Sequence, residues 1–329
     1  MKLNSIFTDN MVLAAGKPIR IFGEGNGVAE VSFCGNTARC SSDNGRWLCE
    51  LPAQEFGGPY TMKINLNGEE TLLKDIYVGV VFLLAGQSNL QFKVRDSHKE
   101  GHLVKKNDKK RFFMLLRIED AEDTHPEDGW VKGDGDISSW SLLGSFMADK
   151  IMEQKDVAVG LIGCYQGASV IEAWLPEEVC DRPEFFIPIE EKTYSHINPD
   201  YAAWNKNGRL YEFMFKKIVP FSVSDVIWYQ GESNTTVAEA AIYDKEVAAL
   251  IDCWRADLLD PTLRFTVVQI ANLRTQADNW HSLQEAQLRV PSLVSNCISV
   301  ISKDVCEDDD IHPQSKKALA ERIVSALEI

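Results

Sequence analysis

The sequence has few basic residues and no apolar run long enough to span a membrane. Lysine and arginine number 34 against 49 aspartates and glutamates, which gives a formal net charge of −15. With no continuous basic face, the chain is not expected to bind nucleic acid. Residues 1–4 lack the apolar core of a secretory signal. These absences predict a cytoplasmic protein without nucleic-acid or membrane partners, and they do not indicate an oligomeric state.

The cysteines lack the spacing of a metal site. None of the eight forms a C-x-x-C pair, so no bound metal is expected. A chain of 329 residues can bury a large core and needs no disulfide framework. We therefore predict that most cysteines are small buried hydrophobic residues in a reducing compartment. The alternative is a bridge between two of Cys34, Cys40 and Cys49.

Several common enzyme motifs are also missing. The chain contains no G-x-S-x-G elbow, which disfavours an ordinary α/β-hydrolase. It contains neither a Walker A sequence nor a G-x-G-x-x-G fingerprint, so nothing indicates a nucleotide-binding loop.

Two regions of the chain follow different patterns. Up to about residue 74, short segments alternate apolar and polar residues between turn signals such as Asn67-Gly68, as in residues 29–33 and 60–64. This pattern predicts a small all-β domain, resembling a sandwich, over residues 1–74. Residues 75–329 alternate strands with helices, which predicts an α/β domain with a doubly wound parallel sheet.

The α/β region is expected to contain buried strands at residues 76–84, 157–162, 225–229, 264–270 and 297–301. Helical patterns cover residues 140–155, 208–219, 237–258, 280–288 and 313–327. Residues 93–137 are polar and rich in turn formers, which predicts a loop excursion over one edge of the sheet.

Ser88 follows the first of these strands and begins a predicted helix. Ligands of open α/β sheets bind at the carboxyl ends of the strands. Helix N-terminal N–H groups at this place can stabilise a developing negative charge. These features indicate a nucleophile, and the alternative is a serine that only caps the helix.

His312 lies in the loop between the last strand and the last helix, which the predicted sheet brings to the edge that carries Ser88. Asp309 and Asp310 stand three and two residues before it, so one carboxylate could orient the imidazole while the other ring nitrogen takes a serine proton. The alternative is that these residues cap the last helix. The remaining histidines are predicted to lie on the surface: His98, His102, His125, His196 and His281.

Acyl transfer also needs donors for an oxyanion. Gly167 follows the strand at 157–162, and Gln230 follows the strand at 225–229. With the Ser88 N–H, the Gly167 N–H and the Gln230 amide are predicted to form the oxyanion hole. Ser233 is a rival nucleophile that is better explained as a polar loop residue.

Four blocks of the sequence together resemble the sialate O-acetylesterase family, a family of SGNH-type carbohydrate esterases. They are Gly-Gln-Ser-Asn at 86–89, Gly-Ala-Ser-Val-Ile-Glu-Ala-Trp at 167–174, Trp-Tyr-Gln-Gly-Glu-Ser-Asn at 228–234, and Asp-Ile-His-Pro-x-x-Lys at 310–316. Residues 7–13 and 74–79 extend the resemblance into the first region. Ala168 replaces a glycine usual in the family, Leu90 replaces a methionine, and a further β-region of longer relatives is lacking.

The resemblance implies a flavodoxin-like three-layer α/β/α sandwich and an esterase without a cofactor. Ser88 would be the nucleophile and His312 the base, with Asp309 or Asp310 as orienting acid, or neither in a Ser–His dyad. Gln87, Asn89 and Glu232 stand in the same blocks and are predicted to contact substrate.

The predicted function is therefore hydrolysis of O-acetyl esters on a carbohydrate through an acyl-enzyme. Sialic acid is the first-choice sugar, and acetylated xylose or another acetyl-sugar is the alternative. An acidic sugar would need a cationic contact, for which Lys93, Arg95 and Arg274 are candidates. A non-catalytic carbohydrate-binding protein and a lipid or thioester hydrolase are the other hypotheses.

Overall fold

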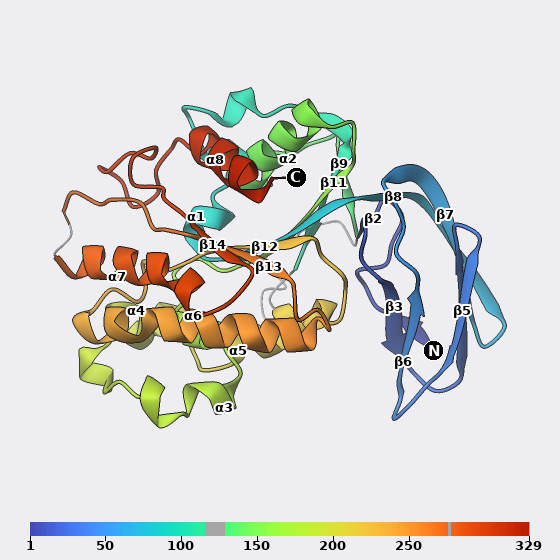
Figure 1. Ribbon diagram of the computed structural model, residues 1–329, viewed down its shortest axis with the longest axis horizontal. Helices are drawn as coiled ribbons and strands as arrows, with labels where there is room; N and C mark the ends of the chain where they lie inside the picture. The colour runs from blue at the N-terminus through green and yellow to red at the C-terminus, as the bar shows by residue number, and fades with distance from the viewer. Residues whose placement is uncertain (116–128, 276–277, 329) are drawn as a thin grey trace.

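A computed structural model describes residues 1–115, 129–275 and 278–328 and confirms a mixed α/β fold. A β-rich region formed by the N-terminal residues lies beside a larger region of strands and helices (Figure 1). Within the described residues, no helix combines the length and apolar character that crossing a membrane requires.

The N-terminal strands form antiparallel pairs. One sheet has the order β1 (Lys2–Leu3), β3 (Ile19–Glu24), β6 (Arg46–Leu51), and a second group pairs β4 (Val28–Phe33) with β5 (Asn36–Ser41) and β7 (Gly57–Leu66). Alternate residues of β4 and β6 are buried, as expected for strands with one face on a core.

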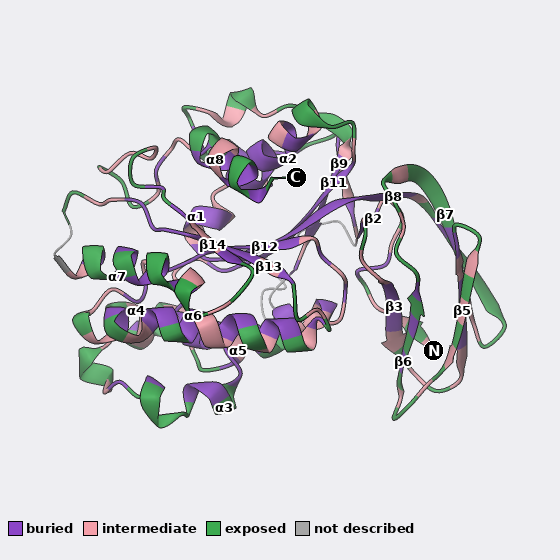
Figure 2. Cartoon of the chain, viewed as in Figure 1, coloured by how far each residue is buried: buried purple, intermediate pink, exposed green. Residues whose placement is uncertain are grey.

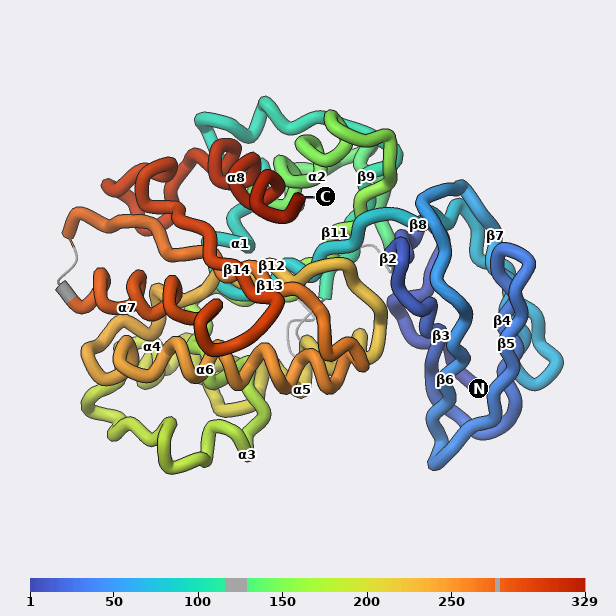
Figure 3. Tube along the Cα trace, viewed as in Figure 1, coloured from blue at the N-terminus to red at the C-terminus, as the bar shows by residue number. Residues whose placement is uncertain are grey.

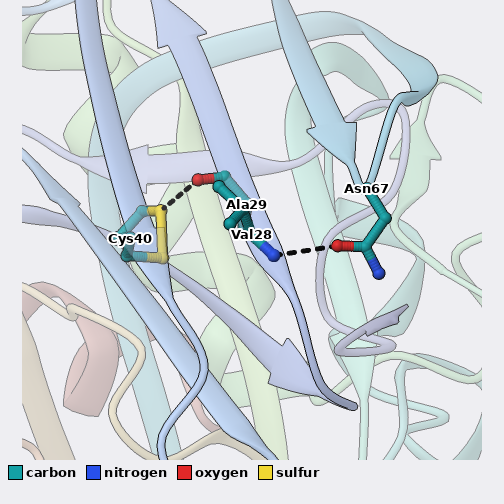
Figure 4. Close-up of a disulfide and its surroundings, with 5 residues drawn as sticks. Val28, Ala29, Cys40 and Asn67 are labelled. Atoms are coloured by element: carbon teal, nitrogen blue, oxygen red, sulfur yellow. Dashed lines mark hydrogen bonds between the residues drawn. A yellow bond between two sulfur atoms is a disulfide. The ribbon is translucent and has the colours of Figure 1, made fainter.

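A disulfide between Cys40 and Cys49 joins β5 to β6 beside β4 (Figure 4). The prediction of buried free thiols is therefore wrong for this pair and right for Cys164, Cys180 and Cys297. Disulfides are more typical of oxidising compartments, and the cytoplasmic location stays a prediction.

The strand β8 (Glu69–Gly86) connects the two regions. Its first residues are mostly exposed and pair with β7, whereas every residue from Ile76 to Gly86 is buried. Residues 77–79 pair with β2 (Val12–Ala14), and residues 80–86 pair in parallel with β11 (Val159–Tyr165). The predicted boundary after residue 74 thus falls inside one continuous strand, visible in Figure 3 as the link between the two regions.

All the predicted strands of the α/β region are present. They are β8, β11, β12 (Asp225–Tyr229), β13 (Arg264–Val268) and β14 (Cys297–Val300), arranged in parallel in the order β11-β8-β12-β13-β14. The chain therefore changes direction across the sheet at β8. Such a reversal leaves a crevice at the carboxyl ends of the central strands, where ligands bind in open α/β sheets.

Helices lie on both sides of this sheet (Figure 1). On one side are α2 (Leu142–Gln154) and α8 (Lys317–Leu327), and on the other are α6 (Val237–Asp257) and α7 (Asp278–Arg289). The sheet and the helix faces toward it are buried (Figure 2). The shorter helices are α1 (Ser88–Gln91), α3 (Glu177–Cys180), α4 (Tyr194–Ile197) and α5 (Arg209–Phe213), the last covering only the start of the helix predicted at 208–219.

The loop predicted at residues 93–137 contains a strand instead. β9 (Asn107–Met114) extends the parallel sheet beside β11, and β10 (Val131–Gly133) pairs with it; residues 116–128 lie outside the described residues. The polar composition does not indicate this strand because two of its charged side chains, Lys110 and Arg111, are buried in ion pairs. Lys110 contacts Asp149 at 2.6 Å, and Arg111 contacts Asp75 at 3.3 Å.

The buried Lys110–Asp149 pair predicts a measurable contribution to stability. Lys110→Met leaves Asp149 as an unpaired buried charge and should lower the free energy of unfolding by about 3–5 kcal/mol. Adding Asp149→Leu should recover most of that loss, because both charges are then gone. Urea unfolding at constant m-value measures both changes.

Lys105 supplies the matched control, since it pairs with Glu153 at 2.7 Å on the surface. Lys105→Met should leave the urea midpoint unchanged, as expected for an exposed ion pair. Equal midpoints for Lys105→Met and Lys110→Met would contradict the role given to the buried pair.

Candidate active site

Ser88 lies where the central strand of the parallel sheet ends. β8 ends at Gly86, and Ser88 is the first residue of α1 (Figure 1). Gly86 has a φ of +141°, and a Cβ at this position would lie 2.1 Å from the carbonyl oxygen of Tyr229 in β12. Only glycine therefore allows the two strands to approach here. The chain turns directly after it and leaves Ser88 half-buried at the carboxyl edge of the sheet.

The structure brings His312 into contact with Ser88. Its Nε2 lies 2.8 Å from the Ser88 Oγ, although the two residues are 224 positions apart in the chain. His312 belongs to the loop between β14 and α8, and its ring stacks on Phe92 with centroids 6.3 Å apart. A nucleophilic hydroxyl with a base in hydrogen-bond reach is the arrangement that covalent ester hydrolysis requires.

The surroundings of His312 favour its neutral form. Burial lowers the pKa of the imidazole, and the positive charge of Lys316 acts in the same direction. The carboxylates of Asp310 and Asp96 oppose this effect. A neutral imidazole is the form that accepts a proton from Ser88.

Neither predicted acid binds the imidazole. Asp310 Oδ1 accepts the backbone N–H of His312 at 2.8 Å, and both Asp309 and Asp310 are exposed. Among the residues that the structure describes, no hydrogen bond joins Nδ1 of His312 to a carboxylate. The structure therefore brings Asp310 to the backbone of the histidine loop and leaves Asp309 in solvent.

Gly167 lies next to Ser88, in the turn after β11. A Cβ built on Gly167 would be 3.6 Å from the Ser88 Cβ, so the backbone of the glycine faces the serine closely. The Gly167 N–H donates to Oε1 of Gln91 at 2.8 Å. Gly167 thus lies beside Ser88, and its N–H has a side-chain carbonyl of the protein as its acceptor. Its role as an oxyanion donor stays a prediction. Gln91 was not identified from the sequence.

Gln230 is completely buried behind these loops. Its Nε2 donates to the Ser169 carbonyl at 2.9 Å and to Asn234 Oδ1 at 2.8 Å, and its Oε1 accepts from the Tyr243 hydroxyl at 2.7 Å. Both amide hydrogens therefore have acceptors within the protein. Gln230 could serve as the predicted oxyanion donor only by leaving one of them.

Of the residues predicted to contact substrate, Gln87 and Asn89 are buried and Glu232 is half-buried, and all three form hydrogen bonds between the loops around Ser88. Gln87 Oε1 accepts the Gly231 N–H at 3.2 Å. Asn89 Nδ2 donates to Glu232 Oε1 at 2.5 Å and to the Ile311 carbonyl at 2.9 Å. Gln87 and Asn89 are almost fully inaccessible, so in this structure they connect the loops around Ser88 and do not line an open surface.

Lys316 completes this group, and sequence reasoning gave it no role. Its Nζ donates to Asn89 Oδ1 at 2.8 Å, and its side chain is fully buried. Burial lowers the pKa of Lys316 and raises the pKa of Glu232. The opposite charges of the two side chains counteract both shifts, so each favours the charged form of the other. The only signal in the sequence was its place at the end of the block at 310–316.

The prediction that His196 lies on the surface is wrong. Its side chain is 7% exposed and lies between Glu172, at 3.0 Å, and Glu239, at 3.3 Å.

Within the described part of the chain, no group of three or more acidic, cysteine or histidine side chains could hold a metal. His98, His102 and His281 are exposed as predicted, and His125 lies outside the described residues.

The rival nucleophile Ser233 is buried, and its carbonyl accepts the Thr193 hydroxyl. This places Ser233 in the packing between the β12 loop and the segment before α4. The contact with His312 is made by Ser88.

The chain is similar to known proteins over most of its length. Human sialate O-acetylesterase is 23% identical over 317 residues, which cover 84% of this chain and 59% of the human protein. Mouse sialate O-acetylesterase is 22% identical over 340 residues, which cover 84% of this chain and 62% of the mouse protein. The chain thus spans about three fifths of the length of these relatives.

A crystal structure of a carbohydrate acetylesterase from Xanthomonas citri superposes with a TM-score of 0.83 at 27% identity. The match covers 99% of this chain and 74% of that protein. Residues 78–327 match the family described as carbohydrate esterase, sialic acid-specific acetylesterase. The chain therefore belongs to the family of sialic acid-specific carbohydrate acetylesterases.

Proposed function

We propose that this protein is a serine esterase that removes O-acetyl groups from a carbohydrate, with sialic acid as the first-choice sugar. The observation that carries the proposal is the 2.8 Å contact between Ser88 Oγ and His312 Nε2 at the carboxyl edge of the sheet. Family membership supports the acetyl ester as the substrate class. Acetylated xylose or another acetyl-sugar is the alternative.

The reaction follows from the two side chains. Ser88 Oγ attacks the acetyl carbonyl carbon while His312 Nε2 takes the hydroxyl proton. The tetrahedral intermediate collapses, and His312 gives that proton to the sugar oxygen as the ester bond breaks. Water then attacks the acetyl-Ser88 ester with His312 as base, which releases acetate and restores the serine.

The oxyanion would be held by the N–H groups of Ser88 and Gly167. Ser88 is the first residue of α1, where backbone N–H groups have no partner within the helix. The Gly167 N–H becomes available when the ester oxygen replaces Gln91 Oε1. This exchange favours the transition state, because a hydrogen bond to an oxyanion is about twice as strong as one to a neutral amide.

We also propose that the protein is an SGNH-type, flavodoxin-like three-layer sandwich with an N-terminal all-β domain. This proposal is supported by the strand order β11-β8-β12-β13-β14 and by helices on both sides of the sheet (Figure 1). The strands from β1 to β7 support the separate N-terminal unit.

An acidic sugar would meet a negative protein, so its carboxylate needs a local cation. Lys93 and Arg95 lie two and four residues after the end of α1, and the Arg95 side chain is 57% exposed, with Asp96 at 4.0 Å from it. Arg274 is held by Asp308 at 2.6 Å. Lys93 and Arg95 are therefore the preferred contacts for a sialate carboxylate.

Removing the nucleophile tests the central assignment. Ser88→Ala should lower kcat for 4-nitrophenyl acetate by about 10⁴-fold or more, since the acyl-enzyme can no longer form. Ser233→Ala serves as the control and should retain activity within about threefold. Equal rates for wild type and Ser88→Ala would refute the esterase mechanism and leave a carbohydrate-binding protein as the better hypothesis.

The acyl and sugar preferences form a separate prediction. Turnover of 4-nitrophenyl esters should be highest for acetate and fall with chain length, and a maximum at hexanoate or longer would favour the lipid or thioester hydrolase. Mass spectrometry of products from O-acetylated sialic acids and acetylated xylose oligomers distinguishes the sugars. Loss of sialate deacetylation in Arg95→Met, with xylose deacetylation unchanged, is the result expected for an acidic substrate.

Gln91 should control access to the Gly167 N–H. Gln91→Glu replaces a neutral acceptor by a charged one, whose hydrogen bond is stronger by about 1 kcal/mol or more, so kcat/KM should fall at least about fivefold. Gln91→Met has a similar size and no strong acceptor, so its kcat/KM should equal or exceed that of wild type. A comparable loss in both variants would show that the Gln91 amide assists catalysis instead.

A further inference from the structure

We propose that Lys316 and Asn89 are positioning residues that hold His312 against Ser88 through the backbone of the histidine loop. The inference is based on two contacts of Asn89, the residue after Ser88. Its amide accepts from the buried Lys316 and donates to the carbonyl of Ile311, the residue before His312. The proposal rests on the proposed function. It assigns to Lys316 and Asn89 the positioning role that was expected of a carboxylate at the imidazole.

Two hydrogen bonds join the serine turn to the histidine loop side by side. Ser88 Oγ meets His312 Nε2 at 2.8 Å, and the next residue, Asn89, donates from Nδ2 to the carbonyl of Ile311 at 2.9 Å. Because Asn89 follows Ser88 and Ile311 precedes His312, the second bond constrains the backbone that carries both reacting groups.

Lys316 determines how the Asn89 amide is oriented. An ammonium group can only donate hydrogen bonds, so the atom that it contacts at 2.8 Å must be the amide oxygen. The two hydrogens of Nδ2 then point to the Ile311 carbonyl and to Glu232 Oε1. Every hydrogen-bonding group of this amide except one lone pair is thereby used, and the amide cannot turn without losing a bond to the histidine loop.

Burying a lysine here is costly, and packing alone does not require it. Moving a charge into the interior costs several kcal/mol unless it is compensated, and a methionine of similar length would avoid that cost. Compensation comes from Asn89, from the carboxylate of Glu232 and from the rings of Phe92 and Tyr229, which lie 5.6 and 5.7 Å from the ammonium. Phe92 also stacks on His312, so the lysine supports the imidazole from this side as well.

The loop is anchored on its other side by Asp310. Its carboxylate accepts the backbone N–H of His312 at 2.8 Å, while Nδ1 has no carboxylate partner among the described residues. The carbonyl and the N–H of the Ile311–His312 peptide are therefore both held by hydrogen bonds, the first to Asn89 and the second to Asp310. This arrangement positions the ring without an acid at Nδ1.

The proposal predicts a specific kinetic signature for Lys316→Met. Loosening the loop should lower kcat by about 10–100-fold and change KM less than about twofold, because ester contacts remain and the alignment of the base is lost. The acid limb of kcat/KM should also move to higher pH. The groups that face His312 are Lys316, Asp310 and Asp96, and removing the one positive charge makes imidazole protonation easier.

Lys317→Met is the matched control, since Lys317 is the exposed neighbour and should behave as wild type. Asp309→Asn and Asp310→Asn should each cost less than Lys316→Met. An unmoved acid limb and wild-type kcat in folded Lys316→Met, or a larger loss in either aspartate variant, would overturn the proposal. If Ser88→Ala were fully active, the proposed function itself would fail, so the two failures are distinguishable.

A measurement on the unmodified protein covers the case in which Lys316→Met does not fold. In ¹⁵N-histidine NMR spectra, the Nδ1 site of His312 should show no far-downfield proton of the kind that a ring N–H bonded to a carboxylate produces. Such a resonance, abolished by Asp309→Asn or Asp310→Asn, would assign the positioning role to an acid and overturn the role of Lys316 and Asn89.

Discussion

The parallel pairing of β8 with β11 on one side and β12 on the other is the constraint on which the site depends. It brings the carboxyl ends of three strands to one edge, and Gly86 permits the approach of β8 to the Tyr229 carbonyl there. Ser88, Gly167 and Gln230 follow these three strand ends directly. Their proximity is thus a consequence of sheet register, because Gly86 at the end of β8 is paired with both Tyr165 and Tyr229, the last residues of β11 and β12.

Buried polar groups then connect these strand ends into one unit. Gln230 joins Ser169 to Asn234, and Asn234 Nδ2 donates to Glu172 at 3.0 Å, which in turn holds Lys192 and His196. Lys316, Asn89 and Glu232 form a second group, which is joined by the hydrogen bonds of the Asn89 amide. Of the atoms in the second group, Glu232 Oε2 has no hydrogen-bond partner among the described residues. The bonds that are made rigidify the site, because a displacement would break bonds of buried groups. Rigid surroundings suit a reaction that depends on aligning one hydroxyl with one imidazole.

The strands and the place of Ser88 at a strand end could be predicted because their signals are local. A buried parallel strand is a continuous apolar run, as in residues 76–84, and Ser88 stands just after this run. His312 lies in the loop between the last strand and the last helix. The strand β9 escaped prediction since its Lys110 and Arg111 look like loop residues until Asp149 and Asp75 are placed beside them. For the same reason, His196 was assigned to the surface: its two glutamate partners lie 24 and 43 positions away.

The sequence by itself determined the order of strands and helices, the residues at the strand ends and the family resemblance, because each of these is encoded in contiguous residues. Only the tertiary structure decided how the polar side chains pair: Gln91 on the Gly167 N–H, Gln230 on the loops behind it, and Asn89 with Lys316 on the histidine loop. An amide or ammonium group has no preferred partner along the chain. Its partner is the acceptor that the fold brings to hydrogen-bond distance, about 3 Å.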